Sequence, residues 1–136
     1  MQPLVMVVDD EEKVRKYLSR LLQKRGFTVE TAADGEAALA LLAERDFDVV
    51  LLDVLMPGLD GIAVLKEIKQ RRPLTEVIIL TGNASVNTGV AGLQHGAVDY
   101  LLKPVNLDNL MVCMGEALEQ RRFRQSQPPH RPQKGG

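Results

Sequence analysis

Apolar residues form short runs along the chain, and the stretches between the runs carry apolar residues every three or four positions. The runs lie within residues 4–8, 48–52, 76–80 and 98–102, and residues 27–31 are expected to form a further, more polar short strand. Short runs that are rich in β-branched residues are typical of buried strands. Strands that are apolar on both faces occur mainly in parallel sheets with helices on both sides. The pattern therefore predicts a mostly parallel sheet of five strands.

The stretches between the strands have the periodicity of helices. In residues 11–25 one helical face is apolar, with Val14, Tyr17, Leu18, Leu21 and Leu22. Further helices are expected over residues 34–44, 60–71 and 85–95, and after Asn106, with Asp34 and Asn106 as N-caps. The inner face of the last helix is expected to hold Leu107, Leu110, Met111, Met114 and Leu118. Strands that alternate with helices predict a doubly wound α/β sandwich of three layers, whose strand order this pattern leaves open.

Charged and hydroxyl side chains follow the predicted strands. Asp9 and Asp10 follow the first strand, Asp53 the third, Thr81 the fourth and Lys103 the last. The carboxyl ends of parallel strands meet at one edge of a sheet, so these side chains are expected to lie together. Two like charges 4 Å apart repel by about 4 kcal/mol at an effective dielectric constant near 20. Three carboxylates and one ammonium must therefore take up a proton, move apart or bind a cation.

The residue types in this cluster indicate its chemistry. Oxygen ligands suit Mg²⁺, which keeps several waters and is completed by a phosphate, and clustered His and Cys ligands for zinc are missing from the sequence. Asp53 could attack phosphorus and form an aspartyl phosphate, with Lys103 as a mobile point charge on the phosphoryl oxygens. Because Pro57 and Gly58 turn the chain, Asp53 is expected to be exposed at the lip of the sheet. Taken alone, Asp9 and Asp10 could instead cap the helix that begins at Glu11.

The chain contains four segments in a fixed order: VVDDEEKVRKYL, VVLLDVLMPGLDGI, VIILTGNAS and GAVDYLLKP. Together they resemble the response regulator receiver domain of two-component signal transduction. The resemblance covers residues 4 to about 120, and its specificity comes from four modest motifs in the right order and spacing. It implies a flavodoxin-like (βα)5 sandwich with a parallel sheet of order 2-1-3-4-5.

The resemblance also implies roles for the acidic residues. Asp53 matches the phosphoacceptor of the family. Asp10 matches the direct Mg²⁺ ligand, and Asp9 matches the acid that supports the metal through water. The backbone carbonyl of Leu55 matches the third protein ligand.

The remaining motif positions match the phosphoryl contacts and the switch. Thr81 and Lys103 match the residues that contact the phosphoryl group, and Tyr100 matches the switch aromatic. The peptide bond between Lys103 and Pro104 is cis in this family, a conformation that is accessible mainly before proline. The implied phosphodonor is a sensor histidine kinase or a phosphotransfer protein.

The helix over residues 85–95 is expected to be the bistable element of such a switch. Its interior glycines, Gly89 and Gly92, each cost about 1 kcal/mol relative to alanine. Phosphorylation of Asp53 would shift the populations of two existing states. The surface formed by this helix, the strand over 98–102 and the last helix would then bind a downstream protein, an output domain or a second copy of the chain.

Charge is distributed unevenly along the chain, with an excess of basic residues at the C-terminus. Residues 1–118 carry a net charge of −5 and residues 119–136 a net charge of +4, from five basic residues and one acidic residue. We therefore expect a receiver domain over residues 1–122 and a basic, disordered tail or linker over residues 123–136. A basic tail can bind nucleic acid or a partner, but a solvated tail is the simpler interpretation, and direct nucleic-acid binding by the domain is not expected.

The cellular location is expected to be cytoplasmic. Cys113 is the single cysteine, so no intrachain disulfide can form, which fits a reducing compartment. No apolar run approaches the ~20 residues of a membrane span, and the N-terminus does not resemble a signal peptide. The chain is expected to be a phosphoacceptor rather than an enzyme that turns over a separate substrate.

Two other functions also fit an α/β fold of this size. A Mg²⁺-dependent phosphohydrolase of the haloacid dehalogenase type also uses an aspartate nucleophile, but its D-x-D motif requires an acid where this chain has Leu55. A flavodoxin needs a phosphate loop rich in glycine and hydroxyl groups after the first strand. The acidic run over residues 9–12 would instead repel phosphate unless a cation intervened.

Overall fold

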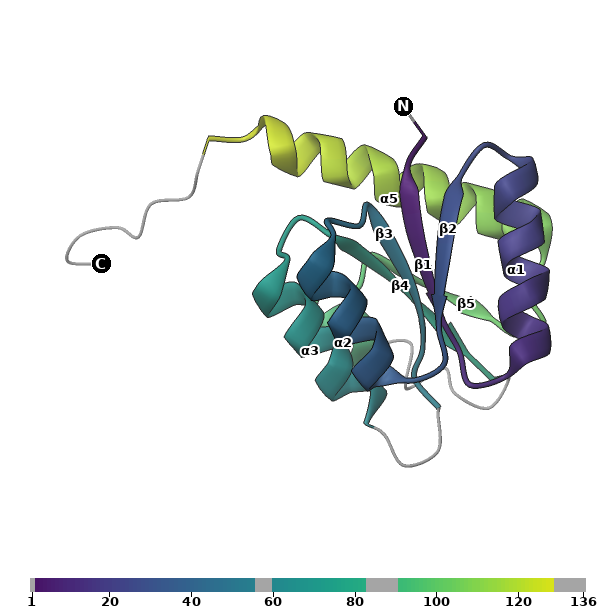
Figure 1. Cartoon of the computed structure of the whole chain (residues 1–136). Helices are drawn as coiled ribbons and strands as arrows, with labels where there is room; N and C mark the ends of the chain where they lie inside the picture. The colour runs from purple at the N-terminus through teal and green to yellow at the C-terminus, as the bar shows by residue number, and fades with distance from the viewer. Residues whose placement is uncertain (1, 56–59, 83–90, 129–136) are drawn as a thin grey trace.

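The computed structural model describes residues 2–55, 60–82 and 91–128 (Figure 1). The elements in chain order are β1 (Leu4–Val8), α1 (Glu12–Lys24), β2 (Thr28–Ala32), α2 (Gly35–Glu44), β3 (Val49–Asp53), α3 (Gly61–Arg71), β4 (Glu76–Thr81), β5 (Asp99–Leu102) and α5 (Leu107–Ser126). Each lies within a few residues of the predicted bounds. Residues 91–94 are also helical, and the first part of the helix predicted over 85–95 lies outside the described residues.

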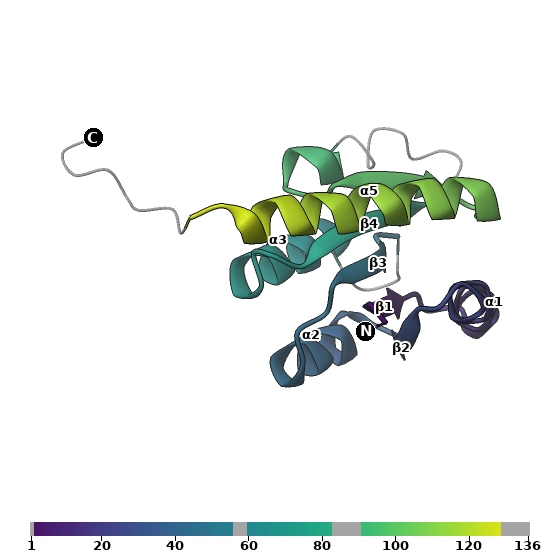
Figure 2. The same cartoon turned by 90° about the horizontal axis from the view of Figure 1, so that it is seen from above.

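The sheet has the order β2-β1-β3-β4-β5, and all its strand pairs are parallel. This confirms the flavodoxin-like arrangement of order 2-1-3-4-5. Helices α1 and α5 cover one face of the sheet, and α2 and α3 cover the other (Figure 2). All strands therefore point the same way, and their carboxyl ends share one edge of the sheet.

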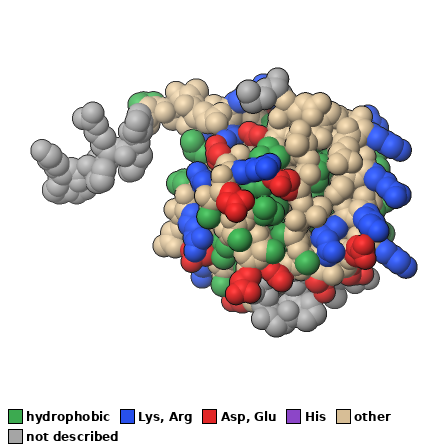
Figure 3. Space-filling view, in the orientation of Figure 1, with side chains coloured by type: hydrophobic (Ala, Val, Ile, Leu, Met, Phe, Trp, Pro, Cys, Tyr) green, Lys and Arg blue, Asp and Glu red, His purple; other side chains and the backbone are tan. Residues whose placement is uncertain are grey.

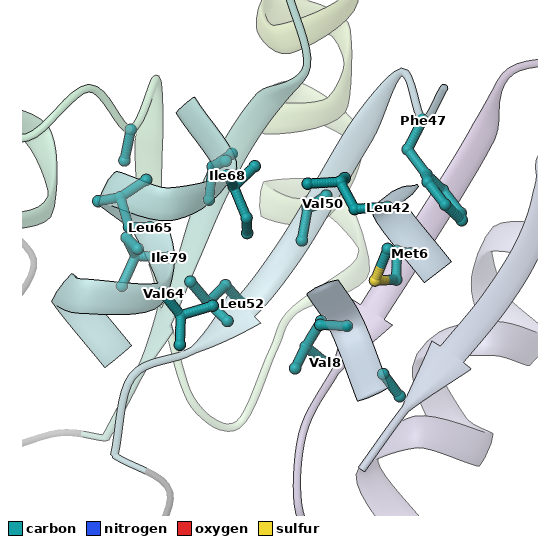
Figure 4. Packing of buried hydrophobic residues seen from close by; sticks show 14 of the residues in the cluster. Met6, Val8, Leu42, Phe47, Val50, Leu52, Val64, Leu65, Ile68 and Ile79 are labelled. Carbon is teal, nitrogen blue, oxygen red and sulfur yellow. The ribbon is translucent and has the colours of Figure 1, made fainter. Parts of the chain in front are cut away.

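The core has two halves, one on each face of the sheet. Successive residues of a strand point to opposite faces, so Met6 and Val8 pack against α2 and α3, while Val5 and Val7 pack against α1 and α5. Figure 4 shows the half under α2 and α3, with Phe47 beside the strand residues. The inner strands β1, β3 and β4 are buried on both faces because both faces of the sheet are covered, whereas the edge strand β2 exposes Thr28 and Thr31.

The helices begin where the sequence predicts caps. The Asp34 carboxylate accepts a hydrogen bond from the backbone N–H of Ala37 at 2.8 Å. The side chain of Asn106 accepts hydrogen bonds from the N–H groups of Asp108 and Asn109 at 2.8 and 3.2 Å. Each cap satisfies donors that the first helical turn leaves without an internal partner.

The inner face of α5 is apolar as predicted, with one charged addition. Leu110 and Met114 are buried, Met111 and Leu118 pack against the same core, and Cys113, Ala117 and Arg121 are buried as well. The Cys113 thiol lies 3.3 Å from the Asp99 carboxylate. Burial, followed by that carboxylate, raises the pKa of Cys113 to about 12. This thiol is a packing group and a poor nucleophile at neutral pH.

Arg121 connects the C-terminal end of α5 to the amino-terminal edge of the sheet, where β3 and β4 begin. Its guanidinium donates to carboxylate oxygens of Asp48 and Asp46, each at 2.9 Å, and to the carbonyl of Leu74 at 2.6 Å. The sequence analysis placed this arginine in a basic stretch next to the tail and did not predict its burial. The helix runs to Ser126, four residues beyond the boundary predicted at residue 122. Residues 129–136 of the predicted tail lie outside the described part of the chain.

No helix in the described part of the chain combines the length and the apolar character needed to cross a membrane.

Candidate functional site

The candidate site lies at the carboxyl ends of the strands. In the orientation of Figure 1 this edge of the sheet faces downward, and Figure 3 shows acidic side chains gathered along the lower edge of the molecule. The structure brings together the carboxylates of Asp9, Asp10 and Asp53, and one oxygen from each lies within 4.8 Å of the others. These are the acids that the sequence analysis selected.

Asp9 is the first residue after β1 and is fully buried. Its backbone N–H donates to the carbonyl of Ala32 at 3.1 Å, which extends the pairing with β2 by one step. Its Oδ1 accepts a hydrogen bond from the N–H of Glu11 at 2.9 Å. Glu11 is itself the N-cap residue of α1 and makes no side-chain capping bond. The side chains of Asp9 and Asp10 therefore do not occupy the N-cap position of the helix.

Asp53 is the last residue of β3 and is only 3% exposed. The sequence analysis predicted an exposed side chain at the lip of the sheet, and this was wrong. The strand continues through Asp53, which pairs with Leu80 of β4. Its Oδ1 accepts from the N–H of Leu55 at 2.9 Å, and its Oδ2 accepts from Lys103 Nζ at 3.1 Å. Pro57 and Gly58, on which the prediction of exposure rested, lie outside the described residues.

Lys103 connects two of the acids. Its Nζ lies 2.6 Å from Asp9 Oδ2, 3.1 Å from Asp53 Oδ2 and 3.9 Å from an oxygen of the exposed Glu11. Its backbone N–H donates to the carbonyl of Thr81 at 2.8 Å, and the peptide bond to Pro104 is cis. The lysine is thus fixed to the end of β4 through its backbone while its ammonium bridges the acids.

The site carries more negative than positive charge. Burial raises the pKa of Asp9, and the nearby charge of Asp53 adds to this, although the ion pair with Lys103 and the hydrogen bond from the N–H of Glu11 act in the opposite direction. Burial would lower the pKa of Lys103, but its contacts with Asp9 and Asp53 outweigh burial and raise it. The ammonium therefore stays charged, yet one ammonium faces three carboxylates.

A divalent cation fits this arrangement. The site offers several carboxylate oxygens within the reach of one ion, and a buried carboxylate whose pKa is raised gains from an added positive charge. Asp10 is exposed, so the cluster opens to solvent on its side. Hard oxygen donors without nitrogen or sulfur suit Mg²⁺ better than zinc. Leu55 lies two residues after Asp53 at the same edge of the sheet. Its backbone N–H donates a hydrogen bond to Asp53 Oδ1. Among the described residues no hydrogen bond joins its backbone carbonyl to Asp53.

Thr81 and Tyr100 lie on neighbouring strands. Thr81 ends β4, is fully buried, and its hydroxyl lies 3.4 Å from the carbonyl of Gly82. The register pairs Thr81 with Leu102 and Ile79 with Tyr100, so the side chains of Thr81 and Tyr100 point to the same face of the sheet. Tyr100 is partly buried against the core half under α2 and α3.

Sequence reasoning missed Arg15. Its Nη1 donates to the backbone carbonyl of Asp9 at 2.7 Å. Its position six residues after Asp9, one turn into the first helix, is a signal that could have indicated a contact back to the strand end.

Comparison with known proteins gives a consistent result. The family model for the response regulator receiver domain matches residues 5–114. The chain is 40% identical over 126 residues to the DNA-binding transcriptional regulator NtrC of Salmonella typhimurium, covering 93% of this chain and 26% of that regulator. It is 45% identical over 106 residues to the transcriptional regulatory protein TcrA of Mycobacterium tuberculosis, covering 78% of this chain and 42% of that protein.

Solved structures agree with these sequence relatives. A receiver domain protein from Clostridium thermocellum superposes with a TM-score of 0.84 at 32% identity, covering 90% of this chain and 98% of that one. NtrX from Brucella abortus superposes with a TM-score of 0.87 at 34% identity, covering 92% of this chain and 28% of that one. The chain thus spans between about a quarter and two fifths of the length of the two curated regulators above.

Proposed function

Since the chain belongs to the response regulator receiver domain family, we propose that Asp53 accepts a phosphoryl group and that this modification switches the surface around β5 and α5. The observation that carries the proposal is the meeting of Asp9, Asp10 and Asp53 with Lys103 at the carboxyl edge of the sheet. NtrC and TcrA are transcriptional regulators by name, so this chain is proposed to control an output of that kind.

Asp53 and Lys103 are proposed to carry the transfer. A carboxylate oxygen of Asp53 attacks the phosphorus of a phosphohistidine, the P–N bond breaks, and the histidine nitrogen leaves with its electron pair. The ammonium of Lys103, already 3.1 Å from Asp53 Oδ2, then contacts an oxygen of the transferred group. The backbone N–H of Leu55 holds the other Asp53 oxygen at 2.9 Å and orients the carboxylate for the attack. Thr81 is proposed as a second phosphoryl contact.

Mg²⁺ is the proposed cofactor. Asp10 and Asp53 would hold it directly, together with the backbone carbonyl of Leu55, and Asp9 would support it through water. When bound, the ion neutralises charge on the phosphoryl oxygens and on the acids. Asp9 is proposed to keep its carboxylate in place through its contacts with the N–H of Glu11 and with Lys103.

The phosphodonor is proposed to be a sensor histidine kinase or a phosphotransfer protein. Beside Lys103 the surface has an apolar groove of about 200 Å³, lined by Val14, Tyr17, Pro104 and Val105 among others. Tyr17 is 49% exposed there. An apolar patch next to the entrance of the site is suited to hold a partner that delivers a phosphoryl group.

The readout is proposed to act through Thr81 and Tyr100. Movement of Thr81 toward a phosphorylated Asp53 would leave room for Tyr100 to turn inward, because the two side chains share one face of the sheet. The surface of β5 and α5 carries exposed apolar side chains, with Leu102 44% exposed and Val112 60% exposed. This surface is proposed to bind the downstream protein, an output domain or a second phosphorylated copy. The predicted helix over 85–95 belongs to this proposal and lies largely outside the described residues.

The protein is proposed to act in the cytoplasm and to promote only its own phosphorylation and slow dephosphorylation. Residues 1–122 are proposed as the receiver unit and residues 123–136 as a tail or linker, with no direct nucleic-acid binding by the receiver unit. None of the relatives described above supports a phosphohydrolase of the haloacid dehalogenase type, and this second function is not proposed.

Removal of one acid is expected to weaken Mg²⁺ binding. We expect Mg²⁺ to raise the melting temperature of the wild-type protein, because a ligand that binds the folded state stabilises it. In Asp10→Asn the Mg²⁺ concentration that gives half of this effect is expected to rise about tenfold, which corresponds to about 1.4 kcal/mol. Thermal melts over a Mg²⁺ series, with EDTA as the zero point, measure this.

The control is Glu44→Gln, which removes one exposed carboxylate at the end of α2, away from the site. It is expected to respond to Mg²⁺ as the wild type does. A wild-type protein whose melting temperature ignores Mg²⁺, or equal midpoints for wild type and Asp10→Asn, would contradict the proposed cation site.

A further inference from the structure

We propose that Arg15 is a positioning residue that sets the direction of the peptide between Asp9 and Asp10 and thereby the affinity of the site for Mg²⁺. This inference rests on the proposed function, because it concerns the same cation site. Arg15 touches no reacting atom. It acts through the backbone of the two acids.

The contact is a single short hydrogen bond across the end of β1. Arg15 Nη1 donates to the carbonyl oxygen of Asp9 at 2.7 Å, while the Arg15 backbone N–H donates to the carbonyl of Glu11 at 3.1 Å within the start of α1. The paired register of β1 ends at Val8, opposite Ala32 in β2 and Leu52 in β3, and the Asp9 N–H makes one further bond to the carbonyl of Ala32. Among the described residues no backbone N–H donates to the Asp9 carbonyl, and the arginine supplies this donor.

The direction of this carbonyl matters because of peptide geometry. The carbonyl of Asp9 and the N–H of Asp10 lie in one rigid plane, so a hydrogen bond that fixes the carbonyl also fixes the start of Asp10. The Asp9 side chain needs no such help, because its two oxygens already face the N–H of Glu11 and Lys103 Nζ.

Asp10 is the acid that depends on the backbone. It is exposed, and within the described part of the chain no hydrogen bond or ion pair holds its carboxylate. Its oxygen nevertheless lies within 4.8 Å of those of Asp9 and Asp53. The position of the Asp10 carboxylate is therefore set by the backbone of the loop between β1 and α1. Arg15 holds this loop at the peptide that joins Asp9 to Asp10.

Loss of the Arg15 charge and loss of its hydrogen bond are expected to change the affinity for Mg²⁺ in opposite directions. A positive charge near the acids repels a divalent cation, so loss of the charge alone would strengthen Mg²⁺ binding. Loss of the hydrogen bond frees the peptide and would weaken Mg²⁺ binding. Residues that support metal ligands from outside typically change metal affinity by about 10- to 100-fold. The sign of the change in affinity therefore separates positioning from electrostatics.

Helix α1 also supplies a matched control. Lys and Arg side chains gather along this side of the molecule (Figure 3), and Arg20 lies on the same helix, exposed and without any described contact to Asp9 or Asp10. Arg20→Gln removes the same charge without removing the hydrogen bond. Arg15→Lys keeps the charge and removes the planar donor.

The experiment is a Mg²⁺ titration of the full chain, followed by NMR of the backbone amides or by calorimetry. We expect Arg15→Gln to bind Mg²⁺ about tenfold more weakly than wild type, Arg15→Lys to lie between the two, and Arg20→Gln to bind as tightly as wild type or slightly more tightly. The rate of phosphorylation by acetyl phosphate gives a second readout. Relative to wild type, Arg15→Gln should need a higher Mg²⁺ concentration for its half-maximal rate. The factor of this increase should exceed the factor by which its maximal rate falls.

Two results overturn this inference. If Arg15→Gln binds Mg²⁺ with wild-type affinity or more tightly, the arginine does not position the acids, and the proposed function stands. If the wild-type protein binds no Mg²⁺, both the proposed cation site and the role of Arg15 fail. Circular dichroism without Mg²⁺ verifies that each variant is folded, and Arg15→Lys carries the test if Arg15→Gln unfolds.

Discussion

Replacement of Gly61 by alanine is expected to lower the free energy of unfolding by about 3 kcal/mol. Gly61 is the first residue of α3, and a Cβ atom built on it would lie 2.4 Å from the Cα of Val54 and 2.8 Å from its carbonyl oxygen. These neighbours are backbone atoms, so rotation of a side chain cannot relieve the contact. The start of α3 would have to move away from the chain that follows Asp53.

The same substitution in α5 provides the control. Gly115 is exposed in the interior of that helix, and a Cβ atom built on it has no neighbour within 4 Å. Gly115→Ala is therefore expected to raise the free energy of unfolding by about 0.5–1 kcal/mol, because alanine is the better helix former. Urea denaturation measures both variants. Equal stabilities for Gly61→Ala and wild type would mean that α3 does not approach Val54 as closely as described.

Replacement of Lys103 by methionine is expected to lower the free energy of unfolding by about 3 kcal/mol at neutral pH without Mg²⁺. Methionine keeps much of the length of the side chain and removes the ammonium 2.6 Å from the fully buried Asp9. The Asp9 carboxylate would then face Asp53 without the ammonium that now contacts both side chains. Lys66→Met, which removes an exposed lysine from α3, is expected to have a small effect in the same urea denaturation.

The loss in Lys103→Met is expected to depend on pH. Burial already raises the pKa of Asp9, and the contacts with Lys103 oppose that rise, so the pKa of Asp9 should be higher still in the variant. A group whose pKa is higher in the folded state contributes stability that is complete below its unfolded pKa, about 4. That contribution is lost as the pH rises through its folded pKa.

The stability difference between wild type and Lys103→Met is therefore expected to be small near pH 4, which is about the unfolded pKa of an aspartate, and to grow toward neutral pH. Mg²⁺ is expected to recover part of the loss, because it would supply positive charge at the same acids. Urea denaturation at several pH values, with and without Mg²⁺, tests both statements. A loss that is constant with pH would show that Asp9 does not lose its partner when Lys103 is replaced.

Local patterns in the sequence predicted the architecture because each pattern had a direct physical cause. The apolar runs became strands covered on both faces, and Asp34 and Asn106 cap helices as predicted. Hydrophobic period alone left the strand order open, since it identifies strands but not their neighbours. The order 2-1-3-4-5 came from the resemblance of four motifs to a family, and the strand pairing confirms it.

Contacts between distant residues were the part that sequence reasoning could not supply. The burial of Asp53 depends on how far β3 continues and on a lysine fifty positions later. Arg121 is buried because the end of α5 crosses the edge of the sheet at Asp48, and an arginine beside a basic tail gives no local sign of that. Arg15 was missed for a similar reason, because its partner is a backbone carbonyl rather than a charged residue.

The central claim is that Asp53 accepts a phosphoryl group with the help of Mg²⁺. The most direct measurement is intact mass after incubation of the full chain with acetyl phosphate and Mg²⁺, for wild type and for Asp53→Asn. We expect wild type to gain the mass of one phosphoryl group, EDTA to prevent the gain, and Asp53→Asn to gain none. A wild-type protein without added mass, or an Asp53→Asn protein that gains as much as wild type, would contradict the claim.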